Sequence, residues 1–242
     1  MRRSVVIASV LVAALAKTAL ATDYTWTGNG YPPNWFDVDN WSPSGVPDLT
    51  SVVTFPNTAG SIAIDNYVTT DFQTKSITID STHSLDISRS TSATELYINN
   101  GDLTRTSASA GNHTIGIPVY LSGNGNWTIN GSGSLAVGSI NETSAGLNFT
   151  KNGTGTLSIS TATYTGTTTI NAGTLLVGSS GLGAGAVTVV SGATLGPTSG
   201  ATVGRAISIN GIGSGGTGAL SSPSGTTAWS GAITLSTNSS IG

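Results

Sequence analysis

The carboxylates and the few basic residues of this chain are the groups whose types could support chemistry on a glycan. Cleavage of a glycosidic bond uses paired carboxyl groups, and some enzymes add an arginine, a lysine or a calcium ion nearby. No carboxylate follows Glu142, and the only charged residue after Lys151 is Arg205. A glycan-active site would therefore lie between Tyr24 and Glu142. It would require three or more of the following residues to converge in one groove: Asp65, Asp71, Asp80, Asp86, Glu95, Arg89 and Arg105.

Three of the five tryptophans, Trp26, Trp35 and Trp41, fall in a proline-rich segment between Tyr24 and Phe55. A flat indole ring can stack on a sugar, so these residues are our candidates for a carbohydrate contact. The same rings also suit a structural role, because the first turn of a repeat protein exposes apolar surface and unpaired backbone that need a cover. We favour the capping role and keep the sugar platform as the alternative.

Other site chemistries find little support in the sequence. The chain has no cysteine, which excludes disulfides and thiolate metal sites. The one compact group of oxygen ligands, Asp37-Val38-Asp39-Asn40, lacks the glycine turn and final glutamate of a helical calcium loop. Glycine-rich stretches such as 123–125 lack the lysine of a phosphate-binding loop. We therefore predict no catalytic residue, no cofactor and no bound metal ion.

Residues 1–21 have the pattern of a secretory signal peptide. Two arginines follow Met1, an apolar run ends at Ala16, and the small residues Ala19 and Ala21 form the cleavage site. A membrane anchor is the alternative interpretation, but the apolar run is shorter than the ~20 residues that span a bilayer. We predict cleavage after Ala21 and no membrane-spanning segment in the mature chain.

Composition and charge narrow the class of protein further. Charged residues make up only 8% of the chain, and it contains 33 glycines. Abundant glycine, serine and threonine with scattered branched apolar residues are typical of all-β solenoids. Without its predicted leader the chain would carry five basic and eleven acidic residues. This acidic balance argues against nucleic acid as a partner.

A repeated unit within residues 150–196 predicts the architecture. Leu157 and Leu175 each follow a glycine and a threonine, Leu195 follows Gly192-Ala193-Thr194, and the three leucines recur at a nearly regular spacing. Self-similarity at a period of roughly 20 residues is the signature of a stacked solenoid. Apolar residues alternate with polar ones inside each unit, which predicts that the stacked elements are strands.

This stretch resembles the autotransporter-associated β-strand repeat, also called the passenger-associated transport repeat, of bacterial secreted proteins. The matching segments are Lys151–Leu157, Tyr164–Leu175 and Gly192–Gly196. The resemblance implies a right-handed parallel β-helix. It also implies a protein that is secreted or displayed at the cell surface, and associated with the outer membrane if a barrel or an anchor follows.

The sequence as a whole predicts an all-β protein, a right-handed parallel β-helix with an aromatic and proline-rich N-terminal cap. Alternating apolar pairs such as Val53/Phe55 and Leu85/Ile87 predict strands before the repeat, and the glycines of 211–218 predict a loop that bulges from a corner. We divide the chain into a signal peptide (1–21), a Trp/Pro-rich cap (22–55), divergent coils (56–149), the repeat (150–196) and further coils (197–242) that break off within a unit.

We expect a non-catalytic, secreted or surface-displayed repeat protein that serves as a stalk or in adhesion. Its partner would be an extracellular glycan or another component of the cell surface. The alternative is a polysaccharide-active enzyme or a carbohydrate-binding module with its site in the N-terminal half.

Overall fold

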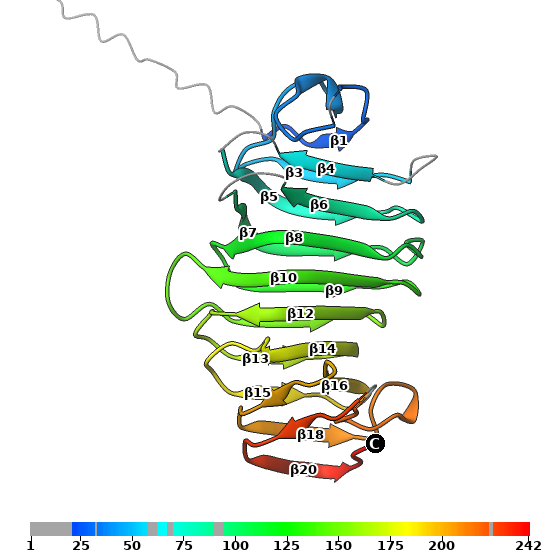
Figure 1. Ribbon diagram of the computed structural model, residues 1–242, viewed down its shortest axis with the longest axis vertical. Helices are drawn as coiled ribbons and strands as arrows, with labels where there is room; N and C mark the ends of the chain where they lie inside the picture. Colours follow the sequence, from blue (N-terminus) through cyan, green and yellow to red (C-terminus); the bar gives the residue numbers. More distant parts are fainter. Residues whose placement is uncertain (1–20, 32, 58–61, 67–69, 90–93, 223–224) are drawn as a thin grey trace, which may run out of the picture.

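The computed structural model describes residues 21–31, 33–57, 62–66, 70–89, 94–222 and 225–242. These residues wind as a β-solenoid of parallel strands, with β1 (Tyr24–Trp26) near one end and β20 (Ile233–Ser239) at the other (Figure 1). Among them, only two 3-10 turns are helical: η1 (Val38–Asn40) and η2 (Ser214–Gly216). The predicted all-β solenoid of parallel strands is confirmed. The predicted signal peptide, apart from Ala21, lies outside the described residues.

The strands stack in two long ladders, because most strands pair with a strand one turn away rather than with their neighbour in sequence. The first ladder contains β3 (Val52–Phe55), β5 (Phe72–Ile79), β7 (Leu96–Arg105), β9 (Gly125–Ile129), β11 (Phe149–Asn152), β13 (Thr168–Ile170), β15 (Val187–Val189), β18 (Ile207–Gly211) and β20. The second contains β4 (Ile62–Asn66), β6 (Leu85–Arg89), β8 (His113–Leu121), β10 (Ser134–Glu142), β12 (Thr156–Ala162), β14 (Gly173–Ser180) and β16 (Ala193–Pro197).

A third ladder forms where the longer strands turn a corner of the coil. The N-terminal halves of β5 and β7 pair with each other, and β7 also pairs with the C-terminal half of β8, which in turn pairs with that of β10. A separate two-stranded sheet joins β17 (Thr202–Val203) and β19 (Ala228–Trp229). Among the described strands, β2 (Trp41–Ser42) is the exception, since it runs antiparallel to β1.

The repeat leucines form one continuous inner column. Leu135 pairs with Leu157, Leu157 with Leu175, and Leu175 with Leu195, and all four side chains are buried. Successive side chains of a strand point to opposite faces, so the alternating polar residues of the same strands face outward. One turn alone could not bury its apolar face, and stability therefore arises from stacking between neighbouring turns.

The corner before the repeat leucines requires glycine. Gly173 has a φ of 66°, a left-handed conformation that side chains rarely adopt. A Cβ at this position would also lie 2.6 Å from the carbonyl oxygens of Gly153 and Gly155 in the preceding turn. The close approach of the two turns, together with the left-handed φ, thus explains the glycine at position 173.

A cluster of aromatic rings lies at the β1 end of the solenoid. Trp35 stacks on Phe72 with ring centroids 4.9 Å apart, and Trp41 meets Trp26 and Trp35 edge-on at 5.0 Å. Phe55 of β3 packs against all three indoles. We call these five residues the aromatic cluster; it joins the proline-rich segment to the first turn of the ladders.

Candidate functional site

The three tryptophans considered for a sugar contact lie inside the aromatic cluster. The exposed fractions of Trp26, Trp35 and Trp41 are 3%, 0% and 2%. Trp41 also donates its Nε1 hydrogen to the carbonyl oxygen of Trp35 at 2.7 Å. Rings packed in this way offer no face to a pyranose, so a sugar contact through them would require the cluster to open. That contact stays a prediction.

Two of the carboxylates considered for glycan chemistry lie next to each other beside a pair of tyrosines. The backbone amide of Glu95 donates to Asp71 at 3.1 Å, and Tyr97 donates its hydroxyl hydrogen to Glu95 Oε2 at 2.7 Å. Tyr97 stacks on Tyr120 with ring centroids 5.1 Å apart. We call these four residues the tyrosine–carboxylate patch; it lies on the outer face of the third ladder, and both rings are half-buried.

Both tyrosines of the patch have raised pKa values. The hydrogen bond to Glu95 raises the pKa of Tyr97 to about 12, with contributions from burial and from the charges of Glu95 and Asp71. Burial and the same two carboxylates also raise the pKa of Tyr120. Both phenols are therefore neutral donors near pH 7, and neither is activated as a base or a nucleophile.

The other residues considered for glycan chemistry are not drawn into this patch. Asp80 accepts a hydrogen bond from Thr106 at a corner, and Asp86 is exposed on the outer face of the second ladder. Arg105 points into the interior of the solenoid. The side chains of Asp65 and Arg89 lie outside the described structure. Of the described members of the set, only Asp71 and Glu95 are adjacent.

Arg105 is completely buried and binds backbone carbonyls at the corner between the first and second ladders. Its Nη1 donates to the carbonyl oxygens of Asn130 (2.6 Å) and Gly133 (2.8 Å) in the next turn. Its Nη2 donates to those of Ser109 (2.9 Å) and Gly111 (3.0 Å) in its own turn. The guanidinium thus connects two successive corners by donating to four of their carbonyl oxygens.

His113 belongs to the same hydrogen-bond network as Arg105. It occupies an inward position of the column that contains Leu135, where neighbouring turns have an aliphatic residue. Its Nδ1 accepts a hydrogen bond from the backbone amide of Leu85 at 3.1 Å, so the proton of the neutral ring lies on Nε2, 2.7 Å from the hydroxyl of Ser109. Burial lowers the pKa of His113 to about 4, and the charge of Arg105 contributes. The imidazole is neutral at pH 7.

Lys151 is the second buried cation, and it belongs to the repeat. Its Nζ donates to the carbonyl oxygens of Gly153 (2.8 Å), Ala172 (2.9 Å) and Asn152 (3.2 Å). Ala172 belongs to the following turn, so Lys151 connects corners as Arg105 does. Burial lowers the pKa of the amine to about 8, which leaves it protonated at pH 7.

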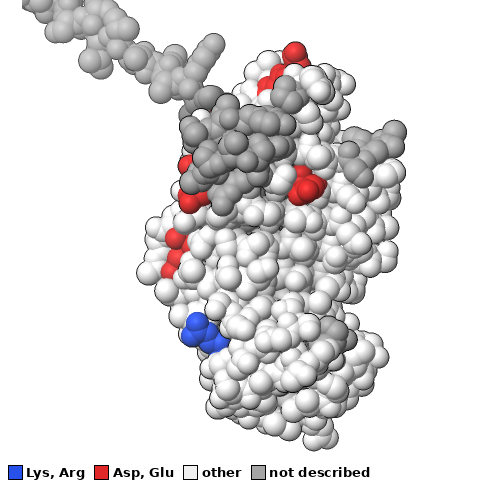
Figure 2. Space-filling model, viewed as in Figure 1, with Lys and Arg blue, Asp and Glu red and all other residues white. Residues whose placement is uncertain are grey.

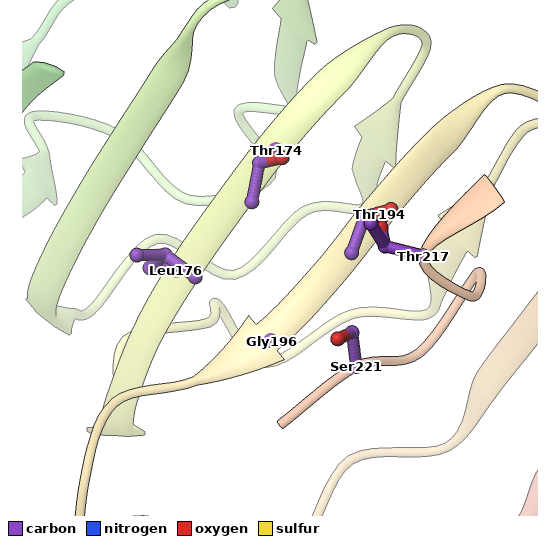
Figure 3. A pocket seen from close by; sticks show the side chains of 6 residues that line it. All are labelled: Thr174, Leu176, Thr194, Gly196, Thr217 and Ser221. Atoms are coloured by element: carbon purple, nitrogen blue, oxygen red, sulfur yellow. Dashed lines mark hydrogen bonds between the residues drawn. The ribbon is translucent and has the colours of Figure 1, made fainter. Parts of the chain in front are cut away.

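A pocket lies on the outer face of the second ladder, over three successive turns (Figure 3). Its volume is about 280 Å³, and it is lined by Thr174 and Leu176 of β14, Thr194 and Gly196 of β16, and Thr217 and Ser221. No lining residue carries a charge. Figure 2 shows that charged side chains are also few and scattered on the face of the molecule that it presents.

The described residues contain no group of three or more histidines and acids that could hold a metal ion. Nor does any described helix have the length and apolar character needed to cross a membrane.

The chain is similar to a known protein family over part of its length. The family model of the passenger-associated-transport-repeat matches residues 149–177, which confirms the resemblance found in the sequence. This match spans β11, β12, β13 and most of β14, and it includes Lys151 and the corner at Gly173. No curated protein and no solved structure matches the chain.

Sequence analysis missed the interior cations and the pocket. The alternation of inward and outward residues could have revealed the cations. Lys151 lies two residues after the inward-facing Phe149, and Arg105 lies two residues after the inward-facing Leu103. The pocket left no comparable signal, since its residues come from three turns that only the folded chain brings together.

Proposed function

We propose that this chain is a non-catalytic, passenger-type repeat protein, secreted or displayed at the cell surface, in which the solenoid acts as a spacer that presents other regions. The observation that carries the proposal is the register: the first ladder continues in parallel pairing from β3 to β20. Such a stack is extended along one axis, and its length grows with each added turn.

The outer surface supports an accompanying role in adhesion. Thr150, Thr169, Thr188, Ser208 and Thr234 follow one another in register on the outside of the first ladder. A row of uncharged hydroxyl groups can donate and accept hydrogen bonds without the desolvation cost of charged groups. A neutral glycan or another polar component of a cell surface is a suitable partner for it.

The proline-rich segment at 22–55 would act as the N-terminal cap of this spacer. The burial of its tryptophans against Phe55 and Phe72 supports that role, because those rings cover the apolar end of the first turn. The division of the remaining chain at residues 149 and 196 likewise stays a prediction.

The proposal is tested with the full chain expressed in a Gram-negative host and with the purified protein. We expect the protein in the periplasm or the medium and not in the cytoplasm. We also expect no release of reducing ends or unsaturated products from a panel of neutral and acidic polysaccharides. Turnover of any polysaccharide that is lost in the Glu95→Gln variant would overturn the non-catalytic role, and retention in the cytoplasm would overturn the surface role.

A glycan-binding or glycan-active site in the N-terminal half is the second candidate, and the tyrosine–carboxylate patch is the observation that favours it. Two half-buried aromatic rings beside two carboxylates can contact both the apolar and the hydroxyl groups of a sugar. Catalysis is less well supported, because Glu95 is held by Tyr97 and only Asp71 lies beside it. Binding of oligosaccharides that is lost in Tyr120→Ala and kept in Trp26→Phe would establish this candidate.

A further inference from the structure

The pocket on the second ladder is built by a loop that folds over the outer face of β16. This loop runs from Gly211 to Gly218 and contains η2. Its glycines at 211, 213, 215, 216 and 218 all have φ values between 61° and 103°, which other residues rarely adopt. The shape of the loop is therefore encoded by its sequence, and it raises a wall beside an otherwise flat sheet face.

Thr194 fixes this wall to the sheet. Its hydroxyl donates to the carbonyl oxygen of Gly218 at 2.8 Å and accepts from the amide of Ser214 at 2.9 Å. The hydroxyl of Thr217 lies 3.3 Å away and donates to the carbonyl oxygen of Ser214. Thr194 is an outward-facing residue of a strand, yet only 3% of it is exposed because the loop covers it.

The rest of the lining offers hydroxyl groups around an apolar floor. Leu176 pairs with Gly196, and Ser221 follows Leu220, which pairs with Leu195, so the floor extends over three turns. The hydroxyls of Thr174 and Ser221 are engaged by no other residue that the structure describes. Gly196 is buried and contributes only backbone to the lining of the pocket.

These features restrict the chemistry of a ligand. The backbone groups of the floor are already used in the ladder between β14 and β16, so a peptide strand could not pair with them. From 152 to 242 the only charged residue is Arg205, which leaves nothing in the lining to attract a phosphate or a carboxylate. A wholly apolar ligand would leave the hydroxyl groups of the pocket unpaired.

We propose that this pocket binds a single neutral pyranose unit of a glycan. The C–H groups of the ring would lie over Leu176 and Gly196, and the ring hydroxyls would exchange hydrogen bonds with Thr174, Thr217 and Ser221. A volume of about 280 Å³ is at the lower end of the sizes of ligand pockets, which fits one sugar unit rather than an oligosaccharide. The proposal names a ligand for the adhesive role proposed above and rests on that role.

The test is a titration of the isotopically labelled protein, followed by the chemical shifts of its amides. The probes are the methyl pyranosides of glucose, galactose and mannose, with cyclohexanol as a ring of similar size that has one hydroxyl. We expect at least one pyranoside to shift the amides of Thr194, Gly196 and Ser221 with a Kd of roughly 1–10 mM. Cyclohexanol should bind at least about 10-fold more weakly, since it lacks most of the hydrogen-bonding groups.

Two variants locate the site, and one provides the control. Gly196→Val adds a branched side chain to the floor of the pocket, and it should weaken binding by at least about 10-fold. Thr174→Val keeps the side-chain shape but removes a hydroxyl, and should weaken binding by about 3–10-fold. Ala136→Val adds bulk at the same outward column on β10, where it should leave the affinity unchanged.

Three results would overturn the proposal: no shift with any pyranoside at about 50 mM, equal binding of cyclohexanol, or undiminished binding by both pocket variants. None of these results would affect the spacer role, which depends on stacking and is tested by export and by the absence of polysaccharide turnover.

Discussion

The coils before the repeat and the coils within it stack in the same parallel register, but their turns contain different numbers of residues. On the second ladder, Leu85, His113 and Leu135 occupy the same inward position in successive turns of the earlier coils. In the repeat, that position is taken by Leu157, Leu175 and Leu195, which follow one another at a closer spacing in the sequence. Both regions keep parallel register, so the additional residues of the earlier coils are accommodated within a turn and do not alter the stacking.

The third ladder accounts for the difference in coil length. In the earlier coils it has three-residue pairings, such as Leu96–Ile98 with Val119–Leu121. In the repeat, this side of the coil is reduced to the single pairing of Thr161 with Ser180. A longer perimeter encloses a wider interior, and a wider interior admits larger side chains.

The side chains buried inside the coils can be compared between the two regions. The wider coils enclose Trp127, Arg105 and His113. The repeat encloses Tyr164 and Lys151 together with smaller aliphatic side chains such as Ile170 and Val189. A buried cation is tolerated where acceptors satisfy it, and for Arg105 and Lys151 these include the corner carbonyls. Buried polar contacts therefore occur in both regions: Arg105 and His113 make them in the wide coils, and Lys151 makes them in the repeat, where the glycine corner at Gly173 brings two turns close together.

Removal of Arg105 should have the largest effect. Arg105→Met leaves four corner carbonyls without their donor, and we expect the free energy of unfolding to fall by about 3–5 kcal/mol in urea denaturation. Lys151→Met, which leaves three, should lower it by about 2–3 kcal/mol. The exposed Arg205→Met is the control and should change it by less than about 0.5 kcal/mol. Equal, small effects for all three variants would show that the corner contacts do not stabilise the fold.

Replacement of a corner glycine by alanine should lower the free energy of unfolding most where two turns approach closely. Gly173→Ala places a Cβ 2.6 Å from two carbonyl oxygens, and we expect a loss of about 2–4 kcal/mol. Gly192 has a similar φ of 86°, but a Cβ there would meet no atom within 4 Å. Gly192→Ala should therefore cost only the backbone strain, about 1 kcal/mol. Thermal unfolding monitored by circular dichroism compares the two, and a reversed order would contradict the close approach of the corners.

Acid should destabilise the wide coils through His113. Its pKa is about 4 in the fold and 6.5 in an unfolded chain, so the unfolded chain binds more protons between these values. The free energy of unfolding should fall by about 2–3 kcal/mol as the pH drops from 6.5 to 4, and this contribution should level off by about pH 3. The difference between the wild type and His113→Leu isolates this effect from the titration of the carboxylates. A His113→Leu protein that keeps the wild-type slope would refute the assignment.

Much of the fold could be predicted from the sequence, because a solenoid repeats local rules. The inward positions at Leu85/Ile87 and Leu157/Ile159 follow directly from alternation, and the corner at Gly173 follows from the repeat. The role of Arg105 could not be predicted in the same way, since its carbonyl partners include Gly133, which lies in the next turn of the solenoid. The tyrosine–carboxylate patch and the pocket likewise depend on which turns become neighbours, and that depends on coil lengths that vary along the chain.

The register of the coils is tested most directly by distances between spin labels. The chain has no cysteine, so pairs can be introduced on the outward column of the first ladder: Ser76→Cys with Thr169→Cys, Thr188→Cys or Ser208→Cys. These pairs are four, five and six turns apart, and at ~4.8 Å per turn their distances should be about 19, 24 and 29 Å. A distance of about 19 Å across the four coils from Ser76 to Thr169, followed by equal increments of about 5 Å, would establish the stacked parallel register. Distances that do not increase along the series would contradict it, and with it the spacer role.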